Sequence, residues 1–140
     1  MEFLSILFKE KKVILQDDIF GPLTVSQVTG GSVIWQGEIN FLDTTVSLFV
    51  YGTKTHLSNQ GRLLLIDFLS NQFSFEPVIN NALKQAYNKA DFSSWHNHFK
   101  CLSIFAKDDE TEIIFQEKKS LREITVCFSG TQLVKILFDN

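Results

Sequence analysis

Apolar and polar positions follow a helical period between Glu76 and Ala90. The apolar members recur three or four residues apart and carry no charge: Val78, Ile79, Ala82, Leu83, Ala86, Tyr87 and Ala90. The positions between them are polar, so the stretch predicts an amphipathic helix whose apolar stripe packs on a core. Pro77 would occupy the first turn, where its missing N–H is tolerated, and Asn71 to Glu76 would link this helix to the preceding one.

A second helical period follows Ser58. Its apolar positions are Leu63, Leu64, Ile66, Phe68 and Leu69. Ser58 or Asn59 would cap this helix, and Gly61 weakens its first turn. Two consecutive helices with a short link predict a helical hairpin.

Period-two patterns flank the helices on both sides. Before the helices they predict strands over Leu23 to Val28, Ser32 to Phe41 and Thr44 to Tyr51, and after them over Lys100 to Ala106, Glu112 to Glu117, Glu123 to Phe128 and Gln132 to Phe138. Short turns join the strands within each group, which favours two antiparallel meanders. The sequence therefore predicts an α+β fold, in which the helical hairpin packs on one face of a curled antiparallel sheet.

Three stretches depart from these patterns. Asp91 to His98 has no period and is interpreted as a loop, and residues 1–18 receive no firm assignment, although Glu2 to Lys12 fits a short helix. Gly37 interrupts the apolar face of its strand, which indicates a bulge or the close approach of another element.

Composition limits the class of protein. A chain of 140 residues with 44% hydrophobic content fits a single domain over residues 1–140. Cys101 and Cys127 lie in apolar runs, so we expect reduced, buried thiols. The apolar run from Phe3 to Phe8 is too short for a signal core, no run has the length of a membrane span, and we therefore expect a cytoplasmic protein with no membrane contact. The net charge of −3 argues against a nucleic-acid partner.

Several short motifs occur in order along the chain. They are Phe20-Gly21-x-Leu23, Trp35-x-Gly37-x-Ile39, a strand over Val46 to Val50, a helix pair ending in Ala86-Tyr87 and a final meander containing Ile124 to Phe128. This arrangement resembles small uncharacterised bacterial domains of the immunity-protein type, which accompany contact-dependent-inhibition and polymorphic toxins. The resemblance implies an α+β protein that binds a cognate toxin 1:1 and neutralises it. It implies no catalytic residue and no cofactor.

Two groups of residues are candidates for contacting such a toxin. The acidic cluster of Asp108, Asp109, Glu110 and Glu112 is either a solvated turn or a plug for the basic cleft of a nuclease. Trp95, placed in the predicted loop, and Tyr51, on the predicted strand, are candidate aromatic anchors.

Two other functions remain open at this point. His96 and His98 are donors that a metal site or a small enzyme would use, but no CxxC or HxxxH spacing accompanies them, so the prediction is no metal. A housekeeping interaction module without a toxin partner is the other alternative. The sequence thus predicts a binding protein rather than an enzyme, and it leaves the oligomeric state open.

Overall fold

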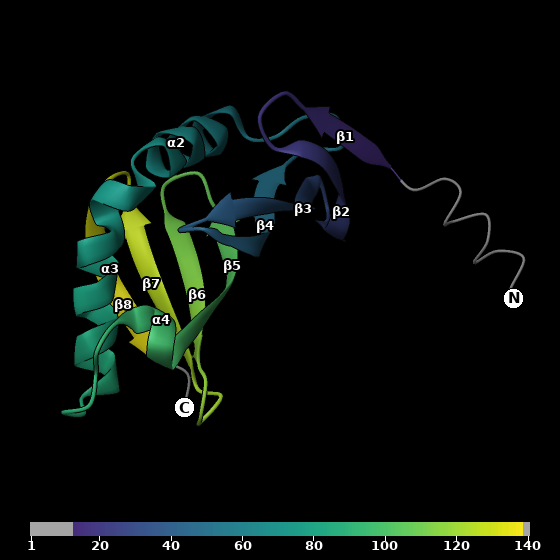
Figure 1. Cartoon of the computed structure of the whole chain (residues 1–140). Helices are drawn as coiled ribbons and strands as arrows, with labels where there is room; N and C mark the ends of the chain where they lie inside the picture. The colour runs from purple at the N-terminus through teal and green to yellow at the C-terminus, as the bar shows by residue number, and fades with distance from the viewer. Residues whose placement is uncertain (1–12, 139–140) are drawn as a thin grey trace, which may run out of the picture.

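The computed structural model of the protein describes residues 13–138 and contains one eight-stranded sheet (Figure 1). The strands neighbour one another in chain order: β1 (Ile14–Asp17), β2 (Gly21–Thr29), β3 (Ser32–Phe41), β4 (Thr44–Gly52), β5 (Phe99–Ala106), β6 (Thr111–Glu117), β7 (Glu123–Ser129) and β8 (Gln132–Phe138). The α+β class and the two meanders are therefore as predicted. β1 lies in the stretch of residues 1–18 for which no firm element was predicted, and the helix predicted over Glu2 to Lys12 lies outside the described residues.

The sheet is not antiparallel throughout, because β4 and β5 run parallel. Between them the chain forms α2 (Asn59–Ser70), α3 (Gln72–Tyr87) and α4 (Trp95–His98). Two parallel neighbours require a long crossover that returns the chain to the starting end of the sheet, and these helices provide it. The fully antiparallel sheet predicted from the sequence is wrong at this one junction.

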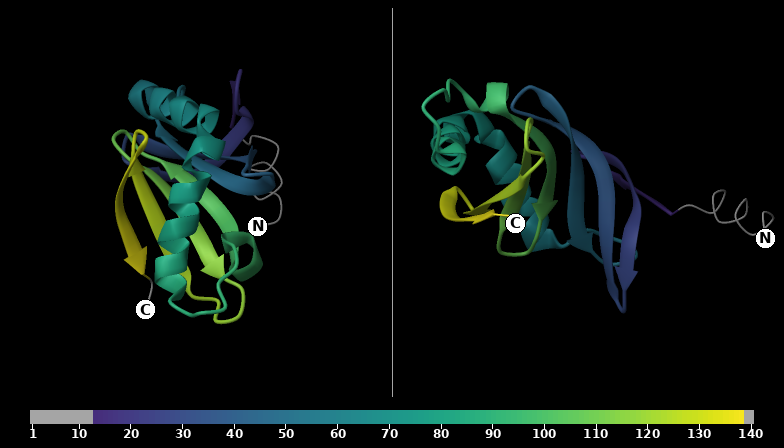
Figure 2. Two further views of the ribbon diagram at one scale, coloured as in Figure 1. Left: turned by 60° about the vertical axis from the view of Figure 1, so that its left-hand side comes forward. Right: turned by 90° about the horizontal axis from the view of Figure 1, so that it is seen from below.

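The predicted helical hairpin is also wrong. Only Asn71 separates α2 from α3, and the two helices lie at a steep angle instead of side by side (Figures 1 and 2). α2 contacts β4 and β5, whereas α3 runs across the second meander and contacts β7 and α4. Each helix thus buries its apolar stripe on the sheet, and a helical period alone does not reveal that angle.

The bounds of α3 differ from the prediction at both ends. Most of the predicted link from Asn71 to Glu76 is helical, so Pro77 lies inside the helix, where it cannot donate a hydrogen bond to the carbonyl of Phe73. The helix ends at Tyr87 because Asn88 adopts a left-handed conformation with φ of 53°. Ala90 is therefore outside the helix. Val78 is 41% exposed, so it does not belong to the buried stripe.

The core fills the space between the helices and the sheet face that they cover. Phe68 of α2 stacks on Phe41 at 5.7 Å between ring centroids, and it also packs on Phe75 and Phe128. On the sheet, the period-two pattern of β4 puts Val46, Leu48 and Val50 on one face, and all three are buried. This face of β4 is therefore the one that the helices cover.

Gly37 marks a close approach, one of its two predicted meanings. An added Cβ would lie 2.5 Å from Leu23 Cδ2, so a larger residue at this position would force the buried Leu23 side chain to move. The bulge in this pair of strands lies instead between Val25 and Gln27.

β1 is attached to the helices by an ion pair. Asp17 Oδ1 accepts a hydrogen bond from Arg62 Nε of α2 at 2.7 Å, and Asp17 Oδ2 accepts from the backbone N–H groups of Ile19 and Phe20.

None of the helices within residues 13–138 has both the length and the apolar character needed to cross a membrane.

Candidate partner-binding surface

The side of the sheet that faces away from α2 and α3 is called the outer face here. On neighbouring strands, residues directly opposite each other share a face. The strand registers place one continuous row across this face: Gln36, Phe49, Phe105, Glu112 and Cys127. Within the described residues no helix covers this row (Figure 2).

Three rings form an aromatic cluster on the outer face, named the outer aromatic cluster: Phe49, Tyr51 and Phe105. Phe49 and Phe105 stack at 4.7 Å with an interplanar angle of 13°, and Tyr51 meets Phe105 edge to face at 6.2 Å. All three residues are half-buried. Tyr51 and Phe105 also line an open hollow of about 380 Å³ with Ile34 and Gln27. Partly exposed rings in a shallow hollow are typical of the central anchors of protein interfaces.

Carboxylates lie at one end of the same row. Oxygens of Glu110 and Glu112 and the sulfur of Cys127 all lie within 4.8 Å of one another. Lys107 Nζ pairs with Glu112 Oε2 at 2.8 Å, and Lys135 Nζ lies 3.6 Å from Glu110 Oε1. The hydrogen bond to Glu112 raises the pKa of Lys107, so this lysine stays charged.

This group does not suit a metal ion. Burial, with a hydrogen bond to Glu110, raises the pKa of Cys127 to about 12, so its sulfur is a protonated thiol, whereas metals bind the thiolate. Both carboxylates already pair with lysines, which an incoming cation would have to displace.

The predicted acidic cluster is not the freely solvated turn that its sequence indicates. Asp108 accepts a hydrogen bond from the Ser58 hydroxyl, and Ser58 caps α2 by accepting from the Gly61 N–H at 3.3 Å. Glu110 and Glu112 have side chains only 19% and 18% exposed. Among the described residues, Asp109 alone of the four has no side-chain hydrogen bond or ion pair. The turn therefore attaches the second meander to α2.

Trp95 is not an exposed anchor. It begins α4 in the predicted loop and is only 3% exposed. Its Nε1–H donates to Glu76 Oε2 at 3.0 Å, and its backbone N–H donates to Asn80 Oδ1 at 2.8 Å. The structure therefore separates Trp95 from Tyr51, Glu110 and Glu112 and gives it the role of attaching α4 to α3.

The two histidines face different neighbours. His96 Nε2 lies 2.9 Å from Glu76 Oε2. His98 Nε2 accepts a hydrogen bond from the Ser93 N–H at 3.3 Å, and its ring packs against Tyr87 and Phe92. Each ring is therefore held by its own partners, and the two do not converge on the shared site that the metal-binding alternative requires.

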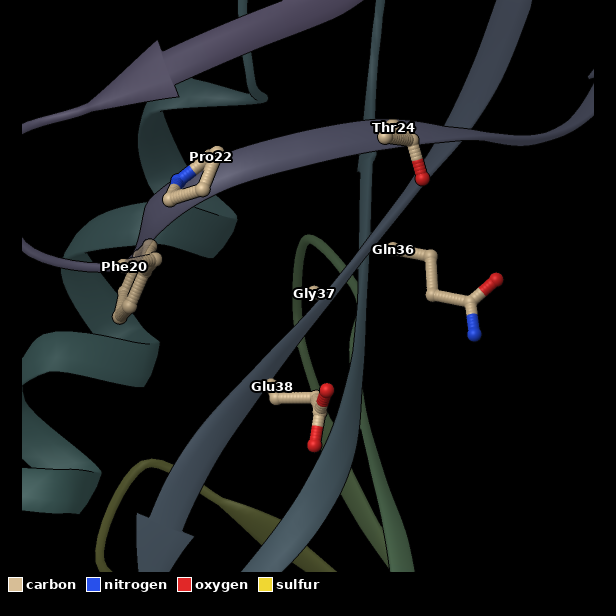
Figure 3. Close-up of a pocket in the computed structure, with 6 residues that line it drawn as sticks. All are labelled: Phe20, Pro22, Thr24, Gln36, Gly37 and Glu38. Carbon is tan, nitrogen blue, oxygen red and sulfur yellow. The ribbon is translucent and has the colours of Figure 1, made fainter. Parts of the chain in front are cut away.

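A second hollow lies beside the other end of the row. It has a volume of about 480 Å³ and is lined by Phe20, Pro22, Thr24, Gln36, Gly37 and Glu38 (Figure 3). Figure 3 shows the side chains of Gln36 and Glu38 projecting away from the strand backbone. Glu38 is exposed and makes no hydrogen bond or ion pair with the other described residues.

Sequence reasoning missed Phe105 and Glu38 as members of this surface. Phe105 lies between the buried residues Ile104 and Ala106, and this alternation is the signal that could have assigned it to the outer face. Its position beside Phe49 depends on the parallel pairing of β4 and β5, for which the sequence holds no signal.

A comparison of the chain with known protein families, curated proteins and solved structures finds no match.

Proposed function

We propose that the protein is an immunity protein that binds a cognate bacterial toxin 1:1 and neutralises it by occluding its active site or substrate surface. The observation that carries the proposal is the outer aromatic cluster, which lies on a sheet face that none of the described helices covers, with Glu112 in its row and Glu38 diagonal to Phe49. The sequence motifs that resemble immunity-type domains support the same function.

Two kinds of residue in this surface would contribute to binding in different ways. Partly buried aromatic rings provide apolar contact area and lose little conformational entropy on binding, so they supply affinity. Exposed carboxylates such as Glu38 and Asp109 attract a cationic partner over several ångströms and act on the association rate. A toxin that cleaves nucleic acid has a basic cleft, and a nuclease would fit this surface.

The test is binding and protection with the toxin encoded beside this protein's gene. We expect a 1:1 complex with a Kd in the nanomolar range or below, roughly −12 kcal/mol or stronger. Cells that produce the toxin should survive only when they also produce this protein. If calorimetry detects no complex and the cells are not protected, the immunity function is wrong, and a housekeeping interaction module becomes the better interpretation.

Tyr51→Ala tests whether the outer aromatic cluster is the contact surface. We expect the toxin affinity to fall by tenfold or more, about 1.4 kcal/mol, because the variant removes an anchor ring. Phe73→Ala is the matched control, since Phe73 is an aromatic residue on α3 with 57% exposure. Equal losses in both variants, or a loss only in Phe73→Ala, would place the interface elsewhere. Melting temperatures of both variants verify that they are folded.

A further inference from the structure

We propose that the outer face recognises its partner through one arginine side chain, which stacks on Phe49 and forms a forked ion pair with Glu38. The inference rests on the proposed function only for the identity of the partner. It names the chemistry that the surface selects, which the proposed function leaves open.

The register places Glu38 and Phe49 within reach of the same guest. Gln36 lies opposite Phe49, and Glu38 lies opposite Ser47, so Glu38 and Phe49 are diagonal neighbours on one face of the β3–β4 pair. Diagonal neighbours in a sheet are about 7–8 Å apart, close enough for one long side chain to contact both. Glu38 lines the hollow drawn in Figure 3, together with Gln36.

The two aromatic rings provide a flat surface for a cation. Phe49 and Phe105 stack nearly parallel and both are half-buried, so part of this pair of rings stays exposed to a guest. A guanidinium group stacks on an aromatic face through cation–π attraction and is more weakly hydrated than an ammonium group. It also presents a planar fork of N–H donors that matches a carboxylate. Stacking and forked pairing together favour arginine over lysine.

Glu38 is the carboxylate that needs a partner. At the other end of the row, Glu112 is already paired with Lys107 at 2.8 Å, and Glu110 lies near Lys135. Glu38 makes no such contact with the other described residues, and it is exposed. An arriving cation therefore gains most at Glu38 and next to Phe49.

Other occupants of this face fit less well. A nucleic acid would bring phosphates against the exposed carboxylate of Glu38. A second copy of this chain, related by a two-fold axis that passes beside Glu38, would bring the two Glu38 carboxylates together. Like charges in a desolvated interface are unfavourable, so charge complementarity favours a cationic segment of a different protein.

The first arm of the test changes the charge at Glu38 and measures toxin binding by calorimetry. We expect Glu38→Gln to weaken the affinity about tenfold and Glu38→Lys to weaken it more than a hundredfold, because the latter places like charge against the arginine. Asp67→Lys is the matched control: Asp67 is an exposed carboxylate on α2, and the same charge change there should alter the affinity less than threefold. Circular dichroism and melting temperatures verify the fold of each variant.

The second arm modifies the toxin. Toxin whose arginines are blocked with phenylglyoxal should lose binding. Toxin whose lysines are blocked by acetylation should keep an affinity within threefold of that of the unmodified toxin. If the wild-type protein binds but the Glu38 variants bind equally well, or if acetylation abolishes binding while phenylglyoxal does not, the arginine anchor is wrong and the immunity function stands. If the wild-type protein does not bind the unmodified toxin, the proposed function itself fails.

Discussion

At the scale of single residues, burial decides what the titratable groups can do. Cys101 and Cys127 are 4% and 0% exposed, and burial raises the pKa of each thiol to about 12. Both were predicted to lie in strands as inert thiols, and the structure confirms their positions. Cys101 is buried as a member of the core, whereas Cys127 lies between the core residues Val126 and Phe128 and is buried on the outer face.

Both thiols should therefore react slowly in the folded protein. The thiolate is the reactive species, and a pKa of about 12 leaves little of it at pH 8. We expect a thiol reagent to label neither cysteine within the time that labels both in denaturant. The measurement is the time course of labelling by mass spectrometry. Fast modification of either residue without denaturant would show that its sulfur is open to solvent.

Asp17 gives a pH-dependent contribution to stability. Burial alone raises the pKa of its carboxyl, but the hydrogen bonds from Arg62, Phe20 and Ile19 outweigh burial and hold the pKa below its usual value of 3.8. The folded state therefore binds this proton less readily than the unfolded state does. The resulting stabilisation is present above the usual value and is lost as the pH falls through the lowered pKa.

Asp17→Asn should lower the unfolding free energy at pH 7 by about 1.5–3 kcal/mol, the range for hydrogen bonds to charged groups. The difference from the wild-type protein should narrow as the pH falls below 3.8 and through the lowered pKa of Asp17, where the side chains of both proteins become neutral. Asp18→Asn is the control, since Asp18 is exposed and makes no hydrogen bond with the described residues. Urea titrations at several pH values give the comparison. A constant difference from pH 7 to pH 2 would contradict the assigned ion pair.

At the scale of elements, the sequence predicted the kind of element better than its ends. The helical period around Leu83 identified α3, but it could not reveal that Gln72 to Glu76 continues the same helix, because Phe75 is the only buried residue of that first turn. Pro77 was taken as the start because proline favours that place, but it lies in the second turn of the helix, where it leaves the Phe73 carbonyl without its helical donor. The helix ends at Tyr87 because of the left-handed conformation of Asn88, whereas the helical period of the sequence continues through Ala90 and did not reveal this end.

Leu83→Ala and Lys84→Ala test the orientation of α3. Leu83 is fully buried, so its truncation should lower the unfolding free energy by roughly 2–5 kcal/mol. Lys84 is exposed on the opposite side, and its truncation should change stability by about 0.5 kcal/mol or less. Thermal denaturation of both variants gives the difference. Equal melting temperatures would mean that the buried side of α3 is wrongly assigned.

At the scale of the whole molecule, the candidate surface exists because of how the two meanders meet. Phe49 belongs to the first meander and Phe105 to the second, and only the parallel β4–β5 pairing places them side by side. Residues of one strand, such as Phe49 and Tyr51, could be assigned to one face from their spacing. The register between strands that are separated by three helices depends on tertiary packing and leaves no local pattern.

The same arrangement predicts that stability is uneven across the sheet. β6 has a strand on each side and packs on the core, whereas β1 is an edge strand of 4 residues held by β2 and by the Arg62–Asp17 pair. Native-state hydrogen exchange should therefore be slowest in β5 to β7 and fastest in β1. Arg62→Ala should accelerate exchange in β1 without changing β6, whereas Leu83→Ala should accelerate exchange in β6 as well, because it destabilises the whole core. Equal acceleration of β1 and β6 by Arg62→Ala would show that the edge and the centre unfold as one cooperative unit.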